Sequence, residues 1–189
     1  MKKRIIVSTV IVVFALLTIV SYFMFQWLND NQDIEDVIKQ EFRSLGQYVE
    51  NVYAIEYPDD DRALIFYSWS HPDFSNFGVM ELEKTWRGWQ FVEAISNRME
   101  RKNAWLKGVY AEIGDHAILR GPTWANVDKI EIITDDGREY IPDIGKSEWH
   151  MWYLILEDEP FEEATFILYD SDGEVLWEEV LQFDLNLLE

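Results

Sequence analysis

Residues 63–69 read ALIFYSW, a stretch in which both alternating sets of side chains are mostly apolar. Successive side chains of a β-strand point to opposite faces of its sheet, so this stretch would place apolar groups on both faces. We therefore predict a central strand here, with its neighbours in the chain paired beside it.

The segments around this strand have the pattern of an antiparallel meander. Residues 51–57 lead into it through a turn cluster, PDDD, at 58–61. Residues 77–84 alternate between apolar and polar side chains and return as residues 89–95 across the TWRG turn at 85–88, which predicts a hairpin. We expect four antiparallel strands in sequence order.

A helix is predicted ahead of the meander. Its apolar side chains recur with a period of 3.6 residues, and acidic residues occupy its first turn, where the helix dipole favours them. We expect the apolar stripe to pack on the sheet. The stripe comprises Ile34, Val37, Ile38, Phe42 and Leu45.

The second half of the chain contains short apolar runs separated by turn signals. Two tight-turn sequences, DDG at 135–137 and SDG at 171–173, lie between such runs. This spacing is typical of a small sandwich or barrel, and we predict a β-sandwich-like half. The expected strands lie near 104–113, 116–120, 127–133, 138–142, 149–157, 163–169 and 174–182.

A polar, locally basic stretch at 96–103 is the best candidate for a joint between the halves. We therefore divide the chain after its N-terminal segment into residues 28–100, a helix with a β-meander, and residues 101–189, the sandwich-like half. The predicted fold class is an N-terminal transmembrane helix followed by a mainly-β (α+β) ectodomain.

The N-terminal segment has the composition of a membrane anchor. Residues 5–25 carry no charge, and a helix of this length spans about 30 Å, the thickness of a bilayer's hydrocarbon core. A cleaved signal peptide has a shorter apolar core and a small-residue cleavage site, whereas bulky residues end this run. We predict an uncleaved anchor at 5–27, bounded by Ile5, Phe25 and Trp27.

Charge predicts the orientation of this anchor. The basic residues of the tail at 1–4 favour the cytoplasm, so the C-terminal domain is expected outside the cell membrane. The lipid bilayer is the expected partner of residues 5–25. A net charge of −20 opposes contact with nucleic acid, and we expect no nucleic-acid partner. The absence of cysteine excludes disulfides and fits a bacterial surface, above all a Gram-positive one.

The sequence contains no catalytic motif. It lacks a Gly-x-Ser-x-Gly elbow and a Ser-x-x-Lys box, and we expect no enzymatic activity and no cofactor. Asp170, Asp172 and Glu174 form a weak calcium candidate, because closely spaced carboxylates beside a glycine suit a hard cation. The remaining ligands of a calcium loop are missing, so a hairpin turn is the stronger interpretation of these residues.

The tip of the first hairpin is a candidate contact site. Trp86, Arg87 and Trp89 lie there, and exposed Trp and Arg are favoured interface anchors. We interpret the chain as a non-enzymatic accessory, interaction or sensor protein outside the membrane, with another membrane or wall protein as its partner. The alternative is a domain that binds a cell-wall ligand, either a glycan on its Trp faces or Ca²⁺.

Residues 63–68 and 78–89 read ALIFYS and GVMELEKTWRGW. An apolar strand followed by G-V-x-x-L-x-K-x-W-x-G-W resembles a pattern in exported or membrane-anchored proteins of Gram-positive bacilli, a group without an assigned activity. The resemblance covers about thirty residues. It implies a location at the cell surface, and it implies neither an activity nor a functional residue.

Overall fold

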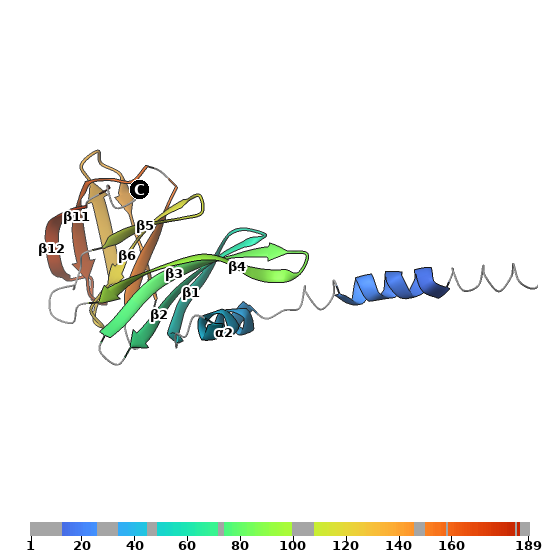
Figure 1. Cartoon of the computed structure of the whole chain (residues 1–189). Coiled ribbons are helices and arrows are strands. Elements are labelled where there is room, and N and C mark those ends of the chain that lie inside the picture. Colours follow the sequence, from blue (N-terminus) through green and yellow to red (C-terminus); the bar gives the residue numbers. More distant parts are fainter. Residues whose placement is uncertain are drawn as a thin grey trace, which may run out of the picture.

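The computed structural model describes residues 13–25, 34–44, 49–71, 74–99, 108–145, 150–157, 159–183 and 185. Three four-stranded sheets, antiparallel throughout, contain most of these residues (Figure 1). The prediction of a mainly-β fold is therefore confirmed.

The first sheet is the expected meander, with strand order β1-β2-β3-β4. Its strands are longer than predicted, because backbone pairing continues through polar residues at the strand ends. The polar stretch at 96–103, predicted as a joint, accordingly begins inside the last strand. The elements of this half are α2 (Ile34–Ser44), β1 (Val49–Asp59), β2 (Arg62–His71), β3 (Phe74–Thr85) and β4 (Gly88–Met99).

Helix α2 covers one face of the meander. Its apolar stripe is buried there, and the ring of Phe42 lies edge-on to that of Tyr67 of β2, with centroids 4.4 Å apart. The predicted packing of helix on sheet is therefore observed, although Leu45 lies outside the described residues. The buried cluster comprises Val37, Ile38, Phe42, Ala63, Ile65, Tyr67, Met80 and Leu82.

The opposite face of the meander packs against the second half of the chain. Phe66 of β2 stacks on Tyr153, with ring centroids 3.9 Å apart. This second buried cluster comprises Leu64, Phe66, Val79, Ala111, Ile113, Ile118 and Tyr153. Strand β2 is thus a central strand with both faces buried, as the ALIFYSW stretch predicted.

Hydrogen bonds join the same two surfaces. The hydroxyl of Tyr153 donates to a carboxylate oxygen of Glu56 at 2.7 Å, and the backbone N–H of Gly114 donates to a carboxylate oxygen of Glu93 at 2.6 Å. The two halves therefore meet through both an apolar cluster and specific polar contacts.

The second half consists of two stacked sheets, with strand orders β5-β6-β10-β9 and β12-β11-β7-β8. Trp152 is fully buried between them, with its ring centroid 5.6 Å from that of Phe166. This strand order is that of an immunoglobulin-type sandwich, here without its usual disulfide. The strands are β5 (Val109–Ile113), β6 (His116–Pro122), β7 (Lys129–Thr134), β8 (Glu139–Tyr140), β9 (Asp143–Gly145), β10 (Met151–Leu156), β11 (Glu163–Tyr169) and β12 (Val175–Gln182).

One predicted strand proved wrong in its extent. The run at 138–142 contains the short strand β8, which pairs with β7, and the chain then passes to the other sheet as β9, which pairs with β10. Pro142 lies between the two strands and has no N–H to donate to a ladder. The chain therefore changes sheets at this point instead of extending one strand.

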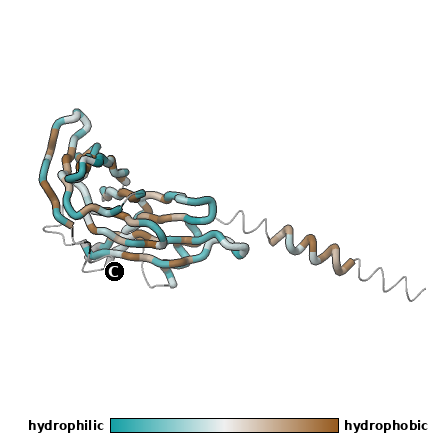
Figure 2. The backbone as a smooth tube through the Cα atoms, turned by 90° about the horizontal axis from the view of Figure 1, so that it is seen from above, coloured by the Kyte–Doolittle hydropathy of each residue, from teal (hydrophilic) through white to brown (hydrophobic). Residues whose placement is uncertain are grey.

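The N-terminal segment is helical over residues 13–25, and its side chains are exposed. Figure 2 shows this stretch as mostly hydrophobic. No helix within the described part of the chain is long and apolar enough to cross a bilayer. Ile5 and Trp27 lie outside the described residues, so the anchor between 5 and 27 stays a prediction.

The shared cluster predicts that the two halves unfold together. Phe66→Ala would remove a 3%-exposed ring from this cluster and lower the free energy of unfolding by about 3–5 kcal/mol. We expect a single transition in urea, followed by Trp fluorescence and by far-ultraviolet circular dichroism. Val180→Ala, at a 54%-exposed position, is the control and should change the free energy by less than about 0.5 kcal/mol. Two separate transitions would contradict a shared core.

Candidate functional site

The turn between β3 and β4 holds two large side chains out in solvent. Trp86 and Arg87 occupy its central positions, and Gly88 follows with a φ of 93°, which closes the turn in a conformation that suits glycine. The hydroxyl of Thr85 accepts a hydrogen bond from the N–H of Arg87 at 3.1 Å and donates to the carbonyl of Gly88 at 3.1 Å. The backbone of this tip is therefore well defined.

The side chains at the tip combine an aromatic ring with a cation. Trp86 is 70% exposed, the largest exposure of any aromatic side chain in the two halves that the structure describes. The guanidinium carbon of Arg87 lies 4.6 Å from the centroid of its ring, within the range of a cation–π interaction. The predicted contact residues Trp86 and Arg87 are thus both presented to solvent.

Trp89, the third predicted contact residue, has a different position. It is half-buried and packs against the cluster beneath α2. Its ring centroid lies 6.1 Å from that of Tyr57, which is 55% exposed on β1. Trp89 therefore supports the surface from below, while Tyr57, which the sequence analysis did not single out, belongs to the surface itself.

Acidic side chains adjoin this tip. Asp59 ends β1, and Asp60 and Asp61 form the exposed turn to β2. The backbone N–H of Lys84 donates to the carbonyl of Asp61 at 2.6 Å. An open depression beside them is lined by Tyr57, Pro58, Asp59 and Asp60. We call the exposed set the hairpin-end surface, made of Tyr57, Asp59, Asp60, Asp61, Trp86 and Arg87.

The calcium candidates lie in the turn between β11 and β12, where the carboxylate of Asp170 accepts backbone N–H groups. One oxygen of Asp170 accepts the N–H groups of Asp172 and Glu174, each at 2.9 Å. Gly173 has a φ of 80°, as a tight hairpin turn requires. Within the described residues, no three His, Cys, Asp or Glu side chains are grouped so as to hold a metal ion. The hydrogen bonds of Asp170 and the φ of Gly173 explain residues 170–174 as a hairpin turn.

The tryptophans proposed as sugar platforms are in unequal positions. Trp152 is fully buried and Trp124 is partly buried. Trp105 and Trp149 lie outside the described residues. Among those described, Trp86 alone presents most of its ring to solvent. A glycan would therefore compete for the same tip as a protein.

A buried guanidinium lies between the meander and the sandwich. Arg120 of β6 is 1% exposed, and its Nη2 donates to the carbonyl of Ile95 at 3.2 Å and to the side-chain oxygen of Asn97 at 2.6 Å. Burial lowers the pKa of Arg120 to about 10, so the group stays charged at neutral pH. Its contacts reach across the sheets to β4, which assigns it to the interface between the halves.

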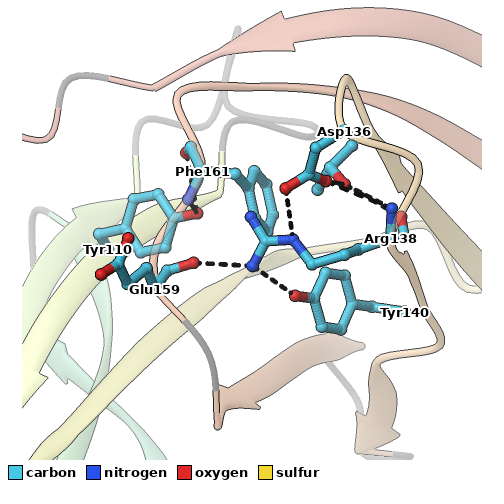
Figure 3. Close-up of polar contacts among 7 residues, drawn as sticks. Tyr110, Asp136, Arg138, Tyr140, Glu159 and Phe161 are labelled. Carbon is cyan, nitrogen blue, oxygen red and sulfur yellow. Dashed lines mark hydrogen bonds and ion pairs between the residues drawn. The ribbon is translucent and has the colours of Figure 1, made fainter.

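A second polar network lies at one end of the sandwich (Figure 3). The guanidinium of Arg138 donates to Asp136 at 2.8 Å, to the Tyr140 hydroxyl at 3.0 Å and to the carbonyl of Glu159 at 3.0 Å. The neighbouring hydroxyl of Tyr110 donates to the carbonyl of Phe161 at 3.0 Å and accepts its N–H at 3.2 Å. These bonds fasten the loop before β11 to the body of the sandwich.

No protein-family model matches the chain, and no curated protein matches its sequence at a significant level.

The buried guanidinium generates one prediction. Asn97→Ala removes a close acceptor from a buried charge, and we expect it to lower the free energy of unfolding by about 1.5–3 kcal/mol. Arg120→Met removes the charge while keeping an apolar chain, but it leaves the oxygens of Ile95 and Asn97 without this donor, so it should also lower the free energy of unfolding. Chemical denaturation of both single variants and the double variant gives their coupling energy. If Asn97→Ala has the same effect with Met at position 120, the two residues are not coupled.

The Arg138 network predicts a stability that depends on acid. Hydrogen bonds from Arg138 and Thr134 lower the pKa of Asp136 to about 2. Because the folded pKa lies below the unfolded one, the stabilisation is complete above about pH 4 and is lost as the pH falls toward 2. At pH 6, Asp136→Asn should therefore have a lower melting temperature than the wild type. The difference in melting temperature between the two should become smaller near pH 2. Asp172→Asn, in the exposed β11–β12 turn, is the control, and an equal loss at both pH values would contradict this assignment.

Proposed function

We propose that this chain is a membrane-anchored, extracytoplasmic accessory, interaction or sensor protein, without catalytic activity, that works by binding a protein partner through the hairpin-end surface. The observation that carries this proposal is the exposure of Trp86 beside Arg87 on a well-defined turn. Tryptophan and arginine are the side chains most enriched among residues that dominate interface energies.

The small contribution of Trp86 to the free energy of folding supports this interpretation of the tip. A 70%-exposed indole gains little from folding, because most of its apolar area stays in water. The hydroxyl of Thr85, bonded to the carbonyl of Gly88 and to the N–H of Arg87, stabilises the turn without needing Trp86. The tryptophan is therefore better explained by a contact outside the two β halves than by their stability.

The location rests on the sequence of the N-terminal segment. Residues 5–25 are uncharged, basic residues precede them, and aromatic residues that suit the lipid interface lie at their C-terminal end. Membrane attachment with an external C-terminal domain is the arrangement that this pattern favours. The resemblance of the first hairpin to exported or anchored proteins of Gram-positive bacilli points to the same location.

The test is capture of a partner from native membranes. The full-length chain is cross-linked in the membrane, purified and compared with the double variant Trp86→Ala, Arg87→Ala. We expect the wild type to recover one reproducible partner and the double variant to lose it, while both have the same melting temperature. Ile141→Ala replaces a 63%-exposed apolar side chain of the sandwich and should keep the partner. Retention of every partner by the double variant would exclude this surface.

A further inference from the structure

We infer that the partner of the hairpin-end surface is an integral membrane protein, which presents a basic extracytoplasmic segment to this surface at the level of the lipid headgroups. This inference rests on the proposed function, because it assumes the membrane anchor and the contact through Trp86. It adds where the contact takes place and what chemistry the partner must offer.

The position follows from a contact between the tip and the N-terminal helix. The ring of Trp86 packs against that of Phe25, with centroids 5.8 Å apart. Phe25 is the last described residue of the helical stretch at 13–25 and the C-terminal end of the predicted span at 5–25. Both hairpin tips lie at the end of the meander nearest this helix (Figure 1). If residues 5–25 span the bilayer, Trp86 lies where the hydrocarbon meets the headgroups, a depth that suits indole rings.

A surface held at that depth can meet either lipid or the external part of a membrane protein, and its charge favours the protein. Asp59, Asp60 and Asp61 are exposed at the same end of the meander as Trp86 and Arg87, so acidic groups outnumber basic ones among the residues of the hairpin-end surface. Carboxylates at this density are repelled by anionic headgroups. The one basic residue of this surface, Arg87, has its guanidinium over the ring of Trp86.

The depression at the β1–β2 turn indicates which groups the partner would offer. It is lined by an aromatic ring, Tyr57, and by the acidic residues Asp59 and Asp60. A lysine or arginine side chain would find carboxylates for its charge and an aromatic face for its stem. The Trp86 ring, at the same end of the sheet, would contact apolar atoms of the same partner. A basic segment that leaves the membrane next to an apolar one has both features.

The experiment is site-specific photo-cross-linking of the full-length chain in native membranes. Trp86 is replaced by benzoylphenylalanine, which retains an aromatic ring, and the product is identified by mass spectrometry. The matched position is Ile141, which is exposed on the sandwich between β8 and β9. We expect a covalent product with an integral membrane protein from position 86 and none from position 141. Asp59→Asn with Asp60→Asn should reduce its yield several-fold, as should raised salt.

A second measurement reports the depth of the tip without any partner. The chain has no cysteine, so Arg87→Cys and Ser171→Cys each create one site for a fluorophore. In nanodiscs that contain nitroxide-labelled lipid, we expect strong quenching at position 87 and little at 171. Equal quenching at both positions, or a product from position 86 with lipid alone or with a protein that has no membrane segment, would overturn this inference.

The results also separate this inference from the proposed function. If the chain fails to float with lipid vesicles, or if neither position captures a protein, the proposed function fails. If a partner is captured from position 141, or if the partner is a wall protein, the chain remains an interaction protein and the inference alone fails.

Discussion

The fold depends on the burial of β2 on both faces. Alternate side chains of this strand serve two separate clusters, one beneath α2 and one against the sandwich. Leu64 and Phe66 would be left in water if the sandwich were absent, and Ile65 and Tyr67 if the helix were absent. Because each exposed side chain of this size forgoes about 1.5–3 kcal/mol of burial, the meander needs both partners. The order of layers, from helix through meander to sandwich, follows from this need.

Polar groups fix the alignment that apolar contact leaves loose. Arg120 reaches the carbonyl of Ile95 and the side chain of Asn97, two residues apart on β4 and thus on the same face of the strand. A shift of β4 by one residue would turn Asn97 to the other face of the sheet. The buried guanidinium of Arg120 would then lose the Asn97 oxygen as an acceptor. Glu81 and Gly114 add a steric condition, since a Cβ at Gly114 would lie 2.7 Å from a carboxylate oxygen of Glu81. The halves therefore dock in one arrangement.

Much of this architecture could be predicted from local patterns. The two apolar sets of residues 63–69 predicted the central strand, and the DDG and SDG turns appear with positive φ at Gly137 and Gly173. Features that depend on distant residues could not be predicted in this way. Arg120 ends an apolar run and looks like a solvent-facing residue, because its partners on β4 are 23 and 25 positions away. The division at Pro142 was missed because one continuous run serves two sheets.

The hairpin-end surface could likewise be predicted only in part from the sequence. The TWRG turn identifies Trp86 and Arg87 from the sequence. The sequence around Tyr57 and the aspartates at 59–61 predicts only a strand end and a turn. Their proximity is nonetheless a consequence of the meander, since the first and third turns of four antiparallel strands lie at the same end of a sheet. The composite surface was therefore implicit in the predicted topology. Neither turn alone has the chemistry of the pair, because one supplies an exposed indole with a cation and the other supplies carboxylates. Their joining at one end of the sheet makes a surface that can select a partner by charge as well as by apolar contact.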